Sequence, residues 1–285
     1  MSRRKKRNKK RAVIFCNIFL TIFIIALIAA IGALGYLAVQ EYHLNRAVKQ
    51  TNETNANTDK KKNTDNNGDR TASDDTTEEN KDTVTLPKTD KVEDSYFDNT
   101  LFLGDSRTVA LTAYGFIDEK NTFAENGISH TTFMSYTWSD SVTNTNGDIF
   151  QIVAARKPDR IYIALGVNGI AFMDESQFLS TYDEMISKLK DSAGDATLVI
   201  ESILPVNEQT GSFDQENLNN DLIDQMNEKL RGLAIKYNAK YLNVAEALKD
   251  SEGKMADEYN NGDGLHYNET GCEKIFDYIS THAAN

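Results

Sequence analysis

Three residue types that can act together in acyl transfer occur at suggestive positions in the sequence. Ser106 comes directly after the apolar run 101–103 and a Gly-Asp pair, while Asp263 and His266 are three residues apart near the C-terminus. A serine hydroxyl is a weak nucleophile unless an imidazole removes its proton and a carboxylate holds that imidazole in the correct tautomer. Because one short loop can supply both partners, these residues predict a serine nucleophile with a His-Asp pair as its base.

The negative charge that develops on the substrate oxygen needs hydrogen-bond donors. Each donor typically lowers the barrier by about 3 kcal/mol. We expect three donors: the Ser106 amide, the Gly127 amide and the side chain of Asn168, which follows the apolar stretch 161–165.

Each motif also has an ordinary explanation. Asp105 and Ser106 could cap a helix, Asn168 could belong to a turn, and Asp263-Gly264 could form a surface turn. These explanations do not account for the joint arrangement: a serine after the first strand, an asparagine after a middle strand, and the Asp-x-x-His pair before the last helix. In an open parallel sheet those three positions meet at one edge, where active sites lie.

Apolar runs alternate with helical patterns from residue 95 onward, which is typical of a parallel sheet covered by helices on both faces. Strands are expected at 100–104, 122–125, 160–165, 197–203 and 240–244. Apolar stripes spaced by three or four residues predict helices that carry Leu218, Leu222, Met226, Leu230, Leu233 and Tyr237, then Phe178, Tyr182, Ile186 and Leu189, and finally Cys272, Ile275, Phe276 and Ile279 after a cap at Asn268. The expected fold is α/β, a flavodoxin-like three-layer α/β/α arrangement with about five parallel strands.

From residue 95 to the C-terminus the sequence resembles the SGNH hydrolases, the GDSL-type esterase and lipase superfamily. The first family block matches Gly104-Asp105-Ser106, which implies Ser106 as nucleophile and its amide as an oxyanion donor. The second block is best matched by Gly127, the third by Gly166-Val167-Asn168, and the fourth by Asp263 and His266. The resemblance is that of a membrane-anchored bacterial surface member.

Two residues depart from the family pattern. Arg107 stands where the family name has Leu, and Gly169 stands where Asp often follows the Asn. Neither change removes a catalytic group, so both bear on subfamily and substrate. The Arg107 guanidinium could hold an anionic substrate group, or it could pair with one of the many acids.

Several other residues near the motifs have two interpretations. Phe133, Tyr136 and Trp138 could wall a substrate cleft that suits a sugar or an acyl chain, and core packing explains them equally well. His130 could line the pocket or compete as base, but it has no Asp at a similar spacing, which favours a polar loop residue. His43 and His282 are expected to be solvated. No two histidines stand at metal-ligand spacing, so we expect no catalytic metal, and no cofactor is indicated.

The N-terminus predicts a membrane anchor. Residues 1–11 carry eight Lys or Arg and no acid, and residues 12–39 contain no charged residue. A helix of that length exceeds the roughly 20 residues that a bilayer core requires. A cleaved signal peptide is the alternative, but its apolar core is usually about 7 to 15 residues long. Basic residues stay in the cytoplasm, so everything after residue 40 is expected outside the cell.

Composition, net charge and cysteine content limit the partners that the chain can bind. Residues 40–94 are rich in Asn, Thr, Asp, Lys and Glu, so we expect a disordered extracellular linker before a hydrolase domain at 95–285. The net charge of −12, which becomes more negative beyond the basic tail, argues against nucleic-acid binding. Of the two cysteines, Cys16 lies in the expected membrane helix, so the external part cannot form an internal disulfide with Cys272.

These observations together predict an extracellular, membrane-tethered serine esterase at a bacterial cell surface. It would remove small acyl groups such as acetyl, through an acyl-serine intermediate, from a cell-envelope glycan or a small ester. The chemistry follows from the residues, and the substrate follows from location and family analogy. One alternative is an O-acyltransferase that uses the same triad, and another is a non-catalytic SGNH-like binding module. The sequence leaves the oligomeric state open.

Overall fold

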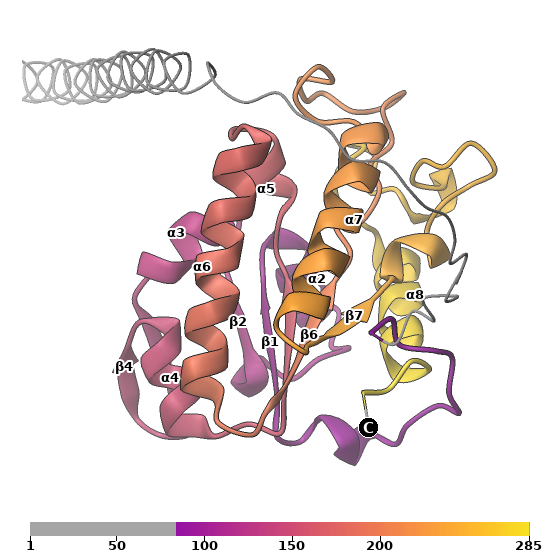
Figure 1. The fold of residues 1–285 in the computed structure, drawn as a ribbon. Coiled ribbons are helices and arrows are strands. Elements are labelled where there is room, and N and C mark those ends of the chain that lie inside the picture. The colour runs from indigo at the N-terminus through magenta and orange to yellow at the C-terminus, as the bar shows by residue number, and fades with distance from the viewer. Residues whose placement is uncertain (1–83, 285) are drawn as a thin grey trace, which may run out of the picture. The chain divides into compact units, whose positions relative to one another are not determined.

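Five parallel strands form the central sheet of the protein (Figure 1). The computed structural model describes residues 84–284. The strands are β1 (Thr100–Gly104), β2 (Thr122–Ala124), β5 (Arg160–Ala164), β6 (Thr197–Glu201) and β7 (Lys240–Leu242). Their order is β2-β1-β5-β6-β7, and every neighbouring pair is parallel. The predicted α/β fold is therefore confirmed, and the strand order is the flavodoxin-like one.

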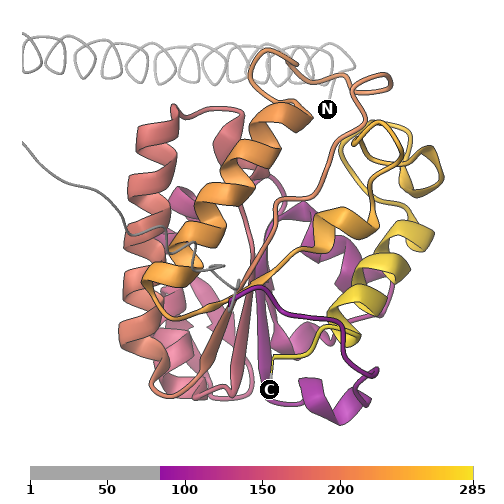
Figure 2. The same ribbon diagram turned by 45° about the vertical axis from the view of Figure 1, so that its right-hand side comes forward.

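Helices cover both faces of this sheet, as Figure 2 shows. Side chains alternate along β1, so Leu101 and Leu103 enter one hydrophobic cluster and Phe102 enters the other. The first cluster is completed by α3 (His130–Ser135), α4 (Ile149–Arg156), α6 (Glu175–Ala193) and α7 (Asn220–Lys236). The second is completed by α2 (Ser106–Ala113) and α8 (Glu269–Ser280). This makes the three layers that the sequence predicts.

The strongly periodic helices agree with their patterns. All four predicted core residues of α6 are buried, and Asn268 caps α8 by accepting a hydrogen bond from the Gly271 amide at 3.0 Å. In α7 the buried face differs in part from the predicted stripe, because Ile223 and Ala234 are buried while Tyr237, at its C-terminal end, is only partly buried.

The sequence did not predict a small antiparallel hairpin of β3 (Trp138–Asp140) and β4 (Thr145–Gly147). The Asp140 carboxylate closes its turn by accepting from the amides of Val142 and Thr143. Three-residue strands are too short to show a reliable alternation of apolar and polar residues. Four 3-10 helices complete the description: η1 (Asp94–Phe97), η2 (Glu119–Asn121), η3 (Val244–Ala247) and η4 (Asp257–Tyr259).

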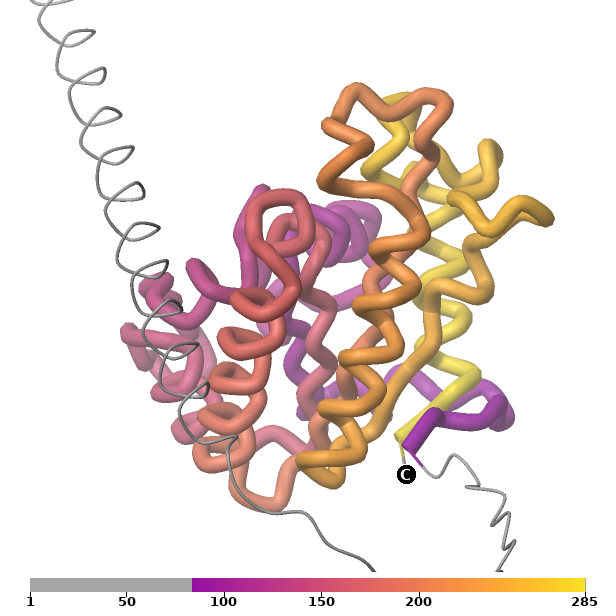
Figure 3. The backbone as a smooth tube through the Cα atoms, turned by 45° about the horizontal axis from the view of Figure 1, so that its top comes forward, coloured from indigo at the N-terminus to yellow at the C-terminus, as the bar shows by residue number. Residues whose placement is uncertain are grey.

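Residues before the predicted domain boundary at 95 pack on the sheet. Val84 and Leu86 are buried, and their backbones exchange hydrogen bonds with Tyr241 of β7, each 2.9 Å long. The Thr89 amide then donates to the carbonyl of Thr281 at 2.7 Å, so this segment runs beside the C-terminus (Figure 3). The predicted linker of 40–94 is therefore too long at its C-terminal end, where two apolar side chains supply enough burial to attach it.

The other N-terminal expectations fall outside the described residues. They are the basic tail 1–11, the apolar segment 12–39 and the linker up to residue 83. Within residues 84–284, no helix is both long and apolar enough to span a bilayer. In the same part of the chain, no group of three or more His, Cys, Asp or Glu side chains could hold a metal ion.

Candidate active site

Ser106, His266 and Asp263 form one hydrogen-bonded chain at the carboxyl edge of the sheet. Ser106 Oγ lies 2.9 Å from His266 Nε2, and His266 Nδ1 lies 2.7 Å from Asp263 Oδ2. The second carboxylate oxygen, Oδ1, accepts from the amides of Leu265 and His266 at 2.9 and 2.8 Å. The structure thus brings together the three residues that the sequence singled out, in the geometry of a nucleophile, a base and an orienting carboxylate.

The environment of Asp263 keeps its carboxylate charged. Burial alone would raise the pKa of this group, but hydrogen bonds from the His266 amide, the His266 ring and the Leu265 amide together lower it. A charged carboxylate accepts the Nδ1 proton of His266, so the unprotonated Nε2 faces the serine hydroxyl. This is the tautomer that can take the proton of Ser106.

Ser106 occupies the turn from β1 into α2. Asp105 caps α2 by accepting from the Arg107 amide at 3.0 Å, so the helix-cap explanation of this motif is correct for Asp105. Ser106 is the first residue of the helix, where amides have no partner within the helix. The cap therefore fixes the serine where both its hydroxyl and its amide can meet a substrate.

The segments that carry the other two expected donors follow β2 and β5, the strands on either side of β1. Gly104, the last residue of β1, pairs with Ala124 of β2 on one side and with Ala164 of β5 on the other. Gly127 lies in the loop after β2, with a φ of 72°, and no described residue accepts a hydrogen bond from its amide. Asn168 lies in α5 (Val167–Ile170), which follows β5 at the carboxyl edge of the sheet (Figure 1).

Asn168 connects α5 to the loop that carries Gly127. Its Nδ2 donates to the carbonyl of Ile128 at 3.0 Å, which uses one of the two amide hydrogens. The second hydrogen remains available to a substrate oxygen. The arrangement can therefore offer the Ser106 amide, the Gly127 amide and one N–H of Asn168 as donors.

A loop that the sequence analysis missed supports the Asp263–His266 segment. Asn207 is fully buried, its amide donates to the Gly264 carbonyl at 2.8 Å, and its Nδ2 donates to Asp257 Oδ1 at 2.7 Å. A Cβ on Gly264 would lie 2.4 Å from the Asn207 carbonyl oxygen, and Gly264 has a φ of 75°. Only glycine suits that position. No local sequence pattern reveals Asn207, because its partners lie about fifty residues away.

Arg107 is a buried residue, 6% exposed, and not an anion-binding one on the surface. Its Nε donates to the Leu265 carbonyl at 3.2 Å, its Nη1 donates to the Leu204 carbonyl at 3.0 Å, and the guanidinium lies 5.6 Å from the centre of the Tyr267 ring. These two hydrogen bonds go to backbone carbonyls and not to an acid, and the buried Nη2 has no hydrogen-bond partner among residues 84–284. The bond of Arg107 to Leu265 connects α2, which carries Ser106, to the loop that carries His266.

The aromatic residues after the second motif belong mainly to the core. Phe133 is fully buried, and Trp138 is 7% exposed and packs against Phe133 and Phe123. Core packing, the alternative explanation, accounts for both. Tyr136 is 39% exposed and donates from its hydroxyl to Glu125, so it alone of the three presents its ring to solvent.

Two histidines differ from their expected surroundings. His130 is fully buried at the first turn of α3 instead of lying in a polar loop, and burial lowers its pKa to about 4. His282 is buried instead of solvated, because its ring stacks on Tyr278 at 3.7 Å and its Nδ1 lies 2.9 Å from the Tyr278 carbonyl. His43 lies outside the described residues.

Two buried acids lie near the nucleophile turn. Glu201 ends β6 and is 3% exposed, and Asp105 is 2% exposed. Burial, reinforced by the nearby charge of Asp105, raises the pKa of Glu201 to about 8. Burial also raises the pKa of Asp105, against the lowering effects of Arg107 and His266. Glu201 is therefore mostly neutral in the folded protein at neutral pH.

We expect Glu201 to make the protein less stable as the pH rises. The unfolded chain loses this proton near the ordinary value of 4.5, whereas the folded protein keeps it up to about 8. The contribution to stability is full below the lower value and is lost through the upper one, an effect of about 5 kcal/mol, of which about 3 to 4 kcal/mol is lost between pH 5 and 8. The free energy of unfolding, measured with urea between pH 5 and 8, should lose this decrease with pH in Glu201→Gln. The control Glu273→Gln, at an exposed position, should keep it. Parallel slopes for wild type and Glu201→Gln would mean that Glu201 is ionised in the fold.

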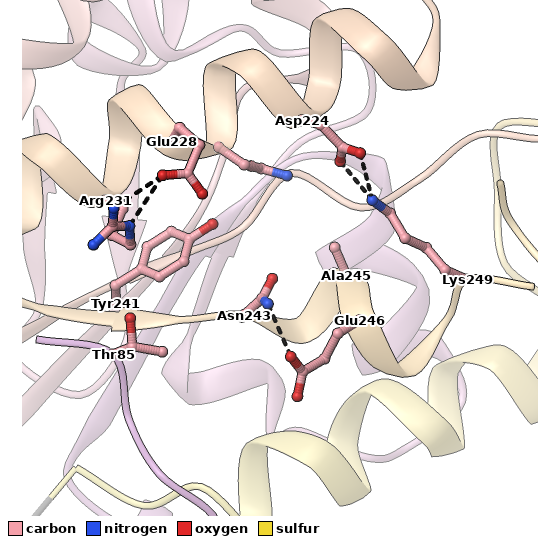
Figure 4. A pocket seen from close by; sticks show the side chains of 10 residues that line it. Thr85, Asp224, Glu228, Arg231, Tyr241, Asn243, Ala245, Glu246 and Lys249 are labelled. Atoms are coloured by element: carbon pink, nitrogen blue, oxygen red, sulfur yellow. Dashed lines mark hydrogen bonds and ion pairs between the residues drawn. The ribbon is translucent and has the colours of Figure 1, made fainter. Parts of the chain in front are cut away.

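A polar cavity of about 590 Å³ lies between α7 and the β7–η3 segment (Figure 4). Its lining includes none of the predicted site residues. Four of its charged groups already form ion pairs, Asp224 with Lys249 at 2.6 Å and Glu228 with Arg231 at 3.0 Å, and the fifth, Glu246, accepts hydrogen bonds from Asn243 and Tyr278. The cavity is therefore separate from the Ser106 site.

Comparisons with known proteins show a family match and similar folds. The sequence profile of the GDSL-like Lipase/Acylhydrolase family matches residues 102–274. A candidate platelet activating factor from Streptococcus pneumonia is similar in structure, with a TM-score of 0.50 and 22% identity over 63% of this chain and 81% of that one. A candidate acylhydrolase from Bacteroides fragilis NCTC 9343 has a TM-score of 0.51 and 18% identity over 68% and 88%. These two likenesses concern the fold. A comparison with curated protein sequences found no match.

Proposed function

Since this chain belongs to the GDSL-like lipase/acylhydrolase family and is a serine hydrolase, we propose that Ser106 is its nucleophile, His266 its base and Asp263 the residue that orients the base. The observation that carries the proposal is the continuous hydrogen-bonded chain from Ser106 Oγ through His266 to Asp263. An intact chain of this kind disfavours the alternative of a non-catalytic binding module.

The proposed reaction has two halves. In the first, His266 Nε2 takes the proton of Ser106 as Oγ bonds to the acyl carbon, and the resulting oxyanion accepts from the Ser106 amide, the Gly127 amide and Asn168 Nδ2. Collapse of this intermediate breaks the ester C–O bond, and the leaving alcohol takes the proton from His266. In the second half, water loses its proton to His266 and attacks the acyl-serine, which releases the acid and restores Ser106.

For the substrate we propose small acyl groups, acetyl above all, on a cell-envelope glycan. What supports this is the predicted location of the domain outside the cell, together with the ester chemistry of the family. No cofactor enters the proposed reaction, because the proton transfers and the charge stabilisation are all assigned to groups of the chain itself.

Water, and not a sugar hydroxyl, is the proposed acceptor of the acyl group. The sequence predicts one membrane span, whereas an extracellular acyltransferase usually needs a multi-span partner to bring the acyl donor across the membrane. Purified protein incubated with acetylated glycan should release free acetate. An acetyl aryl ester plus unacetylated glycan should give little acetylated sugar, with Ser106→Ala as the blank. Efficient transfer to the glycan with little free acetate would instead establish the O-acyltransferase.

The proposed location is the cell membrane, with the N-terminus in the cytoplasm and the hydrolase domain outside. The proposal is supported by the eight basic residues in positions 1–11 followed by the uncharged segment 12–39. External protease added to intact cells should release a soluble, active fragment by cutting in the Asn- and Asp-rich linker. Resistance of the full-length protein until the cells are broken would reverse the orientation.

A further inference from the structure

The ring of His130 lies directly against the backbone of the residue that follows Asn168. A Cβ added to Gly169 would be 2.7 Å from Cε1 and 2.8 Å from Nδ1 of His130, and 2.9 Å from Cε2 of Phe178. A real Cβ atom does not make contacts that short, so the imidazole fills the space that a side chain at position 169 would need. Gly169 is thus the residue that lets α5 approach α3.

His130 is fixed in place from the opposite side by α6 (Glu175–Ala193). Its Nε2 lies 2.7 Å from Thr181 Oγ1, and the Thr181 hydroxyl donates to the Gln177 carbonyl at 2.8 Å. The hydroxyl proton is therefore in use, and the imidazole must donate from Nε2. The ring also packs edge-on against Phe178, with the ring centres 4.6 Å apart. A fully buried ring held by a hydrogen bond and an aromatic contact is a rigid support.

The contact of this ring with Gly169 lies next to the two segments that carry the proposed oxyanion donors. Ile128, whose carbonyl accepts from Asn168 Nδ2 at 3.0 Å, is two residues before His130 and one after Gly127. The Gly127 loop and α5 are therefore joined twice, by that hydrogen bond and by the contact of His130 with Gly169. We therefore expect a change in the second contact to change the separation of the two donors.

We propose that His130 is a positioning residue of the oxyanion site, whose ring sets the distance between α5 and the Gly127–Ile128 loop. The proposal rests on the proposed function, because it takes Gly127 and Asn168 as the donors. It accounts for Gly169 in place of the Asp that often follows the Asn in the family, since an Asp side chain would collide with the imidazole. It also gives a use to a buried histidine whose Nδ1 finds no hydrogen-bond partner among residues 84–284.

Two substitutions change this contact from opposite sides. His130→Ala removes the support, and Gly169→Ala adds a methyl group that pushes against it. A displacement of about 1 Å at such a site can cost about a hundredfold in rate. We expect each variant to lower kcat for an acetyl aryl ester by about 10- to 100-fold, with KM changed less than about threefold. Inhibition by phenylboronate, whose oxygen takes the oxyanion position, should weaken in parallel with kcat.

The double variant gives the sharper result. With Ala at 130 the added methyl group at 169 has room, and the Phe178 ring can move into the vacated space. The kcat loss of the double variant should therefore be clearly smaller than the product of the two single losses. Gly232→Ala is the matched control, because a Cβ at that position of α7 meets no heavy atom within 4 Å. Its kcat should equal that of the wild type.

Titration with a serine-reactive phosphonate would count the competent enzyme, so a variant that folds poorly is still measured per active site. Either of two results would overturn the positioning role. In one, the losses of kcat per active site multiply in the double variant; in the other, His130→Ala keeps the wild-type kcat. In that event an inactive Ser106→Ala would leave the proposed function standing. If Ser106→Ala were active, the proposed function would fail first, and the positioning role with it.

Discussion

Ser106→Ala should lower kcat by about 10⁴- to 10⁶-fold while the fold stays intact. The methyl group cannot attack an acyl carbon, so the acyl-serine intermediate disappears and only binding and the oxyanion donors remain. The hydroxyl of Ser106 is half-buried and makes its hydrogen bond to His266, so its removal disturbs little packing. The measurement is the hydrolysis of a short-chain aryl ester, with unfolding followed by circular dichroism.

Ser180→Ala provides a control for Ser106→Ala, because Ser180 is an exposed serine of α6. Its kcat should match that of the wild type. A serine-reactive phosphonate should label wild-type protein at Ser106 alone. Label found by peptide mapping on another residue would remove Ser106 from the mechanism.

The second large effect should come from the His266–Asp263 pair. His266→Ala leaves Ser106 without a base and should lower kcat about as much as Ser106→Ala does. Asp263→Asn should cost about 10⁴-fold for a different reason. Its carbonyl can still accept from the amides of Leu265 and His266, so the NH₂ group then faces His266 Nδ1. That contact forces the ring proton onto Nε2, which can no longer accept the serine proton.

The pH profile separates these roles. Wild-type kcat/KM should fall in acid, because the proposed reaction needs an unprotonated general base. The hydrogen bonds that Asp263 accepts lower the pKa of its carboxyl group, so we expect it to stay charged while the activity falls. The fall should disappear from the residual activity of His266→Ala. His130→Ala should keep the wild-type profile, and retention of near-wild-type turnover in His266→Ala would show that another base serves Ser106.

The sequence was sufficient for the features that depend on strong local patterns. Buried strands such as Thr100–Gly104 read as apolar runs, and α6 shows its core residues at helical spacing, so the sheet and the main helices were predictable. The Ser106, Asp263 and His266 motifs were also predictable, because the ends of parallel strands and the loop before the last helix converge on one edge of the sheet.

Features that depend on contacts between distant segments were not predictable. The burial of His130 requires α5 and α6 to close over it, and Asn207 finds its partners beyond residue 250. The burial of Arg107 was not predicted, because nothing local shows the carbonyls of Leu204 and Leu265 to which its guanidinium donates. In each case the polar side chain bonds to groups that are distant in sequence and that only the tertiary fold brings near.

The segment that holds Val84 and Leu86 has a consequence for the behaviour of many copies together. It lies along β7, the last strand of the sheet, and uses the backbone groups of Tyr241 that would otherwise point outward. Unprotected strand edges are templates for pairing between molecules. A shortened protein that began at residue 95 should expose such an edge and should associate more readily with other copies. The segment with Val84 and Leu86 thus protects this edge of the sheet from pairing with another copy.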